Sequence, residues 1–228
     1  MSIISLRRAS LAAASIVALQ AAIPSHATAH EQATFKITIA NVADGMTLKL
    51  PGGGATGAPI APGAYAIVRD GAMIFEAGQP AGGDGLEGLA EDGNAEPFIE
   101  HLTAMPGVIE AGLFVPGQSF EVTVRPGERL AFAAMFVQSN DTFVATDPQG
   151  FALFDQNKRP LAGEVTDAIH YWDAGTEIDE TPGVGPNQAP RQASPNSGPA
   201  ENGNVDMQNN EFTYPAIAAV VQASIVPQ

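Results

Sequence analysis

Most of the regular pattern along the chain has a period of two residues. Apolar side chains alternate with polar ones from Phe35 to Ile39 and again from Phe120 to Val124. Because successive side chains of a strand point to opposite faces, this alternation predicts two strands with one buried face and one solvated face. The runs from Leu130 to Val137 and from Ala216 to Val221 are apolar at every position, which predicts strands that are covered on both faces.

Further strands are predicted at residues 64–68, 108–114, 150–154 and 165–172. Several Pro-Gly pairs separate these segments, and such pairs mark tight turns. Short strands joined by turns are typical of an antiparallel β-sandwich. The chain is therefore expected to be all-β, and its length suits a single domain.

One region has a helical pattern instead. Apolar residues from Gly85 to Gly93 and from Ala95 to Met105 recur at helical spacing, which predicts one or two short helices covering an end of the sandwich. The segment from Thr181 to Asp206 is rich in Pro, Gly, Asn and Gln. That composition predicts a long irregular loop.

The composition excludes several classes of protein. The 228 residues include no cysteine, so disulfide frameworks, thiolate metal sites and cysteine nucleophiles are excluded. The 10 basic and 25 acidic side chains give a net charge of −15. Because this charge repels phosphate backbones and anionic lipids, nucleic acid is not an expected partner. No segment after the N-terminal region has the length of apolar sequence that a membrane span requires.

The first 29 residues have the three features of a secretory signal peptide. Arg7 and Arg8 precede an apolar run from Leu11 to Ile23, and Ala27-Thr28-Ala29 has the form of a cleavage site. We therefore expect a signal peptide at 1–29, a mature domain at 30–228, and a secreted or periplasmic location.

Two acidic clusters directly follow predicted strands. Asp141 comes after the strand that begins at Leu130, and Asp173 and Glu177 come after the strand that begins at residue 165. If the segment 150–154 runs back between them, the two outer strands point the same way and their acidic ends meet at one edge. Close carboxylates repel one another unless a cation neutralises them, and a hard cation such as Ca²⁺ prefers oxygen ligands. The pattern favours calcium over zinc or copper.

Several short motifs resemble, in their order, the spondin N-terminal domain in the form found in secreted bacterial proteins. The most distinctive is Tyr-Trp-Asp-Ala-Gly-Thr-Glu at 171–177. The others are Phe75–Ala81, Gly85-Leu86, Leu89–Gly93 and Ser139–Phe143. The resemblance extends from about Phe35 to Val226, although the animal domains carry cysteines and this chain has none.

The resemblance implies a C2-like antiparallel β-sandwich with a divalent cation, calcium or another, bound at one end by loop carboxylates. Carried over by motif, the ligands are Asp141, Asp173 and Glu177. The animal members serve adhesion and recognition of cell surfaces. The resemblance therefore implies a binding module rather than an enzyme, with an extracellular protein or glycan as its partner.

Three alternatives remain open from the sequence. A metal-dependent hydrolase would use the same carboxylates. A copper protein would use His30, which becomes the N-terminal residue if cleavage follows Ala29. In the third, the carboxylates are ordinary solvated loop charges.

Overall fold

The computed structural model describes residues 32–208 and 212–228. The predicted signal peptide and His30 lie outside the described residues. None of the helices within the described ranges has the length and apolar character needed to cross a membrane.

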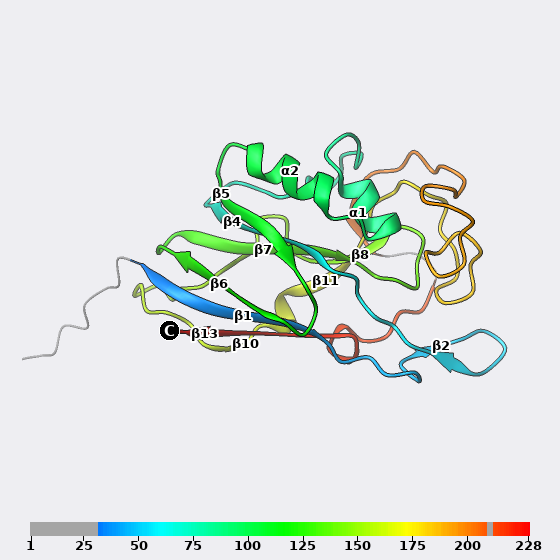
Figure 1. The fold of residues 1–228 in the computed structure, drawn as a ribbon, viewed down its shortest axis with the longest axis horizontal. Helices are drawn as coiled ribbons and strands as arrows, with labels where there is room; N and C mark the ends of the chain where they lie inside the picture. The colour runs from blue at the N-terminus through cyan, green and yellow to red at the C-terminus, as the bar shows by residue number, and fades with distance from the viewer. Residues whose placement is uncertain (1–31, 209–211) are drawn as a thin grey trace, which may run out of the picture.

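The protein is an all-β sandwich of antiparallel sheets with two short helices (Figure 1). The smaller main sheet has the strand order β10 (Gly163–Glu164), β13 (Val221–Pro227), β1 (Ala33–Asn41) and β6 (Ser119–Val124). The larger sheet has the order β12 (Asp206–Met207), β11 (Ile169–Asp173), β8 (Thr142–Thr146), β7 (Glu128–Met135), β4 (Gly63–Arg69) and β5 (Val108–Phe114). The short strand β9 (Phe151–Ala152) pairs with β7, and β2 (Leu48–Lys49) forms a separate hairpin with β3 (Ala55–Thr56).

The core between the sheets is built by the alternation that the sequence contains. Phe35, Ile37 and Ile39 of β1 point inward and are buried. They share one apolar cluster with Leu130 and Phe132 of β7. The predicted strands 35–39 and 120–124 are therefore confirmed as β1 and β6.

A second core lies between the larger sheet and the helices α1 (Leu86–Asp92) and α2 (Glu96–Ala104). Phe98 and Leu102 of α2 pack there with Ala131 and Ala133 of β7. Small alanine side chains allow the helices to approach the sheet closely, so β7 is buried on both faces, as its apolar run predicts. The helices are where the sequence places them, but the expectation that they cover an end of the sandwich is wrong. They lie across the outer face of the larger sheet (Figure 1).

One predicted strand is also misplaced. The apolar run 216–221 contains a 3₁₀ helix at Ile217–Ala219, and the strand begins only at Val221. Three of the six residues in that run are alanines, which are depleted in strands and tolerate exposure. Strand β13 alternates between buried and exposed positions instead of being covered on both faces.

The segment 181–206 is irregular, as its composition predicts, until β12 begins at Asp206. Figure 1 shows this loop gathered at one end of the sandwich, beside α1. The same end carries the beginning of β8 and the end of β11.

Candidate metal centre

Two neighbouring strands bring Asp141 and Asp173 to the same edge of the larger sheet. Asp141 immediately precedes β8, Asp173 is the last residue of β11, and Asp173 pairs with Thr142 across the two strands. The sequence analysis predicted this edge but assigned the wrong strand between β7 and β11. That strand is β8, whereas the segment 150–154 contributes β9, which pairs with β7 on the same edge as β8 but farther along, at Arg129 and Leu130.

The turn before β8 is held by its own polar side chains. Ser139 Oγ donates to Phe136 O at 2.8 Å, closing the turn. Asn140 Nδ2 donates to Ile178 O at 3.1 Å, and Asn140 Oδ1 accepts from Glu180 N at 3.2 Å. These bonds fasten the chain after β11 to the start of β8 without any disulfide.

Asp141 is fully buried, with 0% of its surface exposed. Its Oδ2 accepts hydrogen bonds from the backbone N–H groups of Thr176 at 3.0 Å and Glu177 at 3.1 Å. Its Oδ1 is buried and has no hydrogen-bond partner among the described residues. A carboxylate oxygen that is left unpaired in the interior is costly, so a cation or a proton at this oxygen would stabilise the fold.

A sharp turn after β11 positions the second carboxylate. Asp173 Oδ1 accepts from Gly175 N at 2.7 Å, and Gly175 has a φ of 65°, which favours glycine. The backbone of the long loop crosses over this turn, since Gly203 N donates to Gly175 O at 2.7 Å. A Cβ on Gly175 would lie 2.6 Å from Asn204 O, so the crossing requires glycine.

The crossing brings a third carboxylate into the group. Glu201 N donates to Thr176 O at 2.9 Å. One carboxylate oxygen from each of Asp141, Asp173 and Glu201 lies within 4.8 Å of the other two. Asp141 is buried, Asp173 is partly buried and Glu201 is exposed, so the group is closed on the protein side and open toward solvent.

Burial and mutual repulsion raise the pKa values of the buried acids in this group. Burial, followed by the charge of Asp173, raises the pKa of Asp141 to about 8. Burial, followed by the charge of Asp179, raises the pKa of Asp173 to about 6. Three oxygen donors with this charge fit a hard divalent cation such as Ca²⁺ better than a soft metal.

Glu177, the third ligand implied by the resemblance, does not join this group of three. Its backbone N–H holds Asp141, while its side chain is 3% exposed and Oε1 accepts from Gly198 N at 2.7 Å. Burial raises the pKa of Glu177 above its ordinary value. Glu201 takes the third place, and no signal in the sequence identifies it, because only the loop crossing at Gly175 brings it near.

Trp172 precedes Asp173 and faces the second core. It is buried, and its ring packs edge-on against Phe75 with centroids 5.0 Å apart. This contact anchors the end of β11, and therefore the position of Asp173.

No protein-family model matches the chain, and no curated protein matches it either.

Proposed function

We propose that the protein is an exported calcium-binding β-sandwich of the spondin type that acts as a recognition or adhesion module. The observation that carries this proposal is the buried Asp141 carboxylate, which lies beside Asp173 and Glu201 and whose Oδ1 has no hydrogen-bond partner within residues 32–208 and 212–228. A divalent cation would neutralise all three groups and give the orphaned oxygen a ligand role.

Within this proposal each residue has a separate part. Asp141 would hold the ion from the interior, because two backbone N–H groups already fix its other oxygen. Asp173 would hold it from the end of β11, and the exposed Glu201 would close the site from the loop. The bound cation would supply a positive centre facing solvent, where an acidic side chain or a glycan hydroxyl of an extracellular partner could add a ligand.

The spondin-type assignment and the export rest on the sequence. The order of the motifs supports the first, and the three features of residues 1–29 support the second. The all-β sandwich is the architecture that this family assignment requires.

The test is calorimetric titration of the chelator-stripped protein with Ca²⁺, Mg²⁺ and Cu²⁺, together with melting curves. We expect Ca²⁺ to bind and to raise the melting temperature, and the Asp173→Asn and Glu201→Gln variants to weaken binding at least tenfold. Glu100→Gln removes an exposed charge on α2 and serves as the matched control. Unchanged calcium binding in both site variants would refute the calcium site of Asp141, Asp173 and Glu201. A response to copper alone would favour the alternative hypothesis, a copper-binding protein with His30 as its N-terminal residue.

A further inference from the structure

A second pair of buried carboxylates lies outside the group of three. Glu91, near the end of α1, is 2% exposed, and Glu177 is 3% exposed. Each has one buried oxygen, Oε2, with no hydrogen-bond partner in the described part of the chain. Glutamate is rarely buried this completely unless something compensates its charge.

The charged side chains that raise the pKa of Glu91 are all acidic. Burial raises its pKa to about 7, a hydrogen bond from Thr176 lowers it, and the charges of Glu177, Glu87 and Asp92 raise it further. Glu91 and Asp92 both stand in the last turn of α1, which contains no basic residue. Acids at this end oppose the helix dipole, whose carboxyl end attracts cations.

Two consecutive residues, Thr176 and Glu177, connect the pair to the first site. Thr176 donates to Asp141 Oδ2 from its backbone N at 3.0 Å and from its hydroxyl Oγ1 at 3.4 Å, and that hydroxyl also interacts with Glu91. Glu177 likewise gives its N–H to Asp141 and carries the carboxylate of the pair. The turn after β11 therefore has Asp141 on one side and Glu91 on the other.

Two buried carboxylates with unpaired oxygens need a compensating charge, and the only donors that they offer are oxygens. We propose that Glu91 and Glu177 form a second divalent-cation position, next to that of Asp141, Asp173 and Glu201. This inference extends the proposed cation-binding function, but it rests on a different pair of residues. It also gives Glu177, which is not part of the first group, a role in cation binding.

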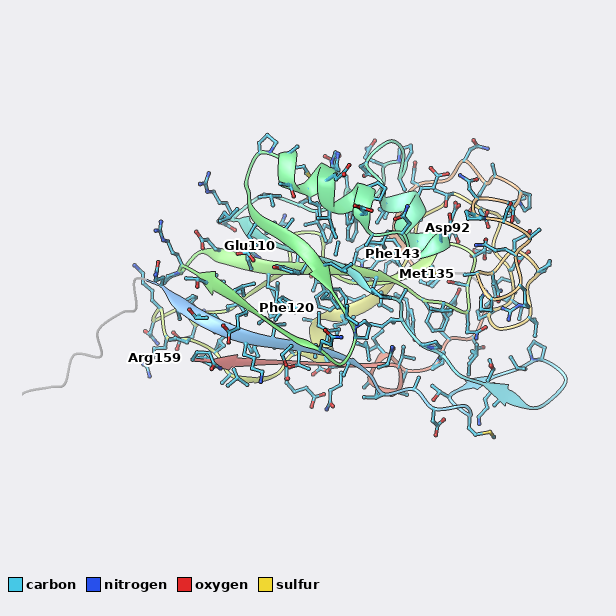
Figure 2. All side chains as sticks on the ribbon, in the orientation of Figure 1. Asp92, Glu110, Phe120, Met135, Phe143 and Arg159 are labelled. Carbon is cyan, nitrogen blue, oxygen red and sulfur yellow. The ribbon has the colours of Figure 1, made fainter. Side chains whose placement is uncertain are left out.

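The second ion fastens the long loop to the helix layer. Gly198 N donates to Glu177 Oε1 at 2.7 Å, and Gln192 Nε2 donates to Asp92 Oδ1 at 2.8 Å. Asn196 Nδ2 donates to Glu87 Oε1 at 3.1 Å. Asp92 lies at the end of α1 that faces these loops (Figure 2). Neutralising Glu91 and Glu177 strengthens this junction, which holds the loop that also carries Glu201.

The experiment is equilibrium dialysis of the chelator-stripped protein against radioactive calcium, which counts bound ions per chain. We expect two ions for the unchanged protein and one for Glu91→Gln. Glu177→Gln is expected to behave in the same way, and Asp141→Asn should lose the other ion and keep this one. Glu96→Gln, an exposed acid on α2, is the control and should still bind two.

A second measurement separates a binding role from a structural one. The Glu91→Gln variant removes a buried charge that the charge of Glu177 opposes, so this variant should melt higher than the unchanged protein in chelator. Its rise in melting temperature on adding calcium should be smaller. One ion in the unchanged protein, lost in Asp141→Asn and kept in Glu91→Gln, would overturn the second position and leave the proposed function standing. Two ions retained in Asp141→Asn would overturn the first site instead.

Discussion

Replacing Asp141 with asparagine should stabilise the protein without calcium and abolish its response to calcium. The side chain keeps its size, and its oxygen can still accept from the N–H groups of Thr176 and Glu177. The new amide group replaces Oδ1, for which the described part of the chain offers no hydrogen-bond partner, and it can donate to the neighbouring carboxylate of Asp173 or Glu201. The variant therefore loses a buried charge and gains a hydrogen bond, but it cannot neutralise a cation.

The magnitude follows from the pKa of Asp141, which is about 8 in the folded chain against an ordinary value of 3.8. Between these values the folded state holds a proton that the unfolded chain releases. Stability therefore falls by about 1.4 kcal/mol for each pH unit above 3.8, or about 4 kcal/mol in total at pH 7. The amide avoids this loss. We expect a gain of about 2–4 kcal/mol in chelator, or a melting temperature higher by about 5–10 °C.

The assay is thermal unfolding at pH 7 in chelator and in saturating calcium, followed by circular dichroism. The unchanged protein should melt higher with calcium than with chelator, and Asp141→Asn should melt at one temperature in both. Glu100→Gln, which changes an exposed acid of α2, should retain the calcium-dependent rise. The reasoning is refuted if Asp141→Asn melts below the unchanged protein in chelator, or if it still responds to calcium.

The raised pKa values of Asp141 and Asp173 also predict that the calcium-free protein loses stability as the pH rises from about 4 to about 8. Calcium affinity should rise over the same pH range, because the ion must displace those protons. Melting curves and calcium titrations at several pH values test this. A melting temperature and a calcium affinity that do not change with pH would contradict it. Gly175→Ala should weaken calcium binding more than tenfold and destabilise the fold by about 2 kcal/mol or more, since its Cβ would press on Asn204 O at 2.6 Å. Gly82→Ala, which has open space around it, is the control for that titration, and equal effects of the two variants would disprove the role of the loop crossing.

Predictions succeeded where a local pattern decides the structure, such as an alternation of apolar and polar residues or a glycine at the end of a helix. The alternation in 35–39 and 120–124 gave strands β1 and β6, and Gly93 ends α1 in a left-handed conformation with a φ of 68°. The prediction for 216–221 failed because alanine carries little information about burial. Strand β8 was missed because its five residues follow the Ser-Asn-Asp turn directly and have no clear alternation.

The sequence by itself determined most of the strands, the two helices, the acidic charge and the meeting of Asp141 with Asp173 at one edge, because these depend on side-chain period and on the direction of strand ends. Only the tertiary structure decided which acids share a site. Glu201 joins the first group through a backbone crossing at Gly175. The packing of α1 on the outer face of the larger sheet puts Glu91 where the charge of Glu177 acts on it. Both meetings join segments that are distant in the chain. Packing and hydrogen bonds in three dimensions set such contacts, and no local pattern records them.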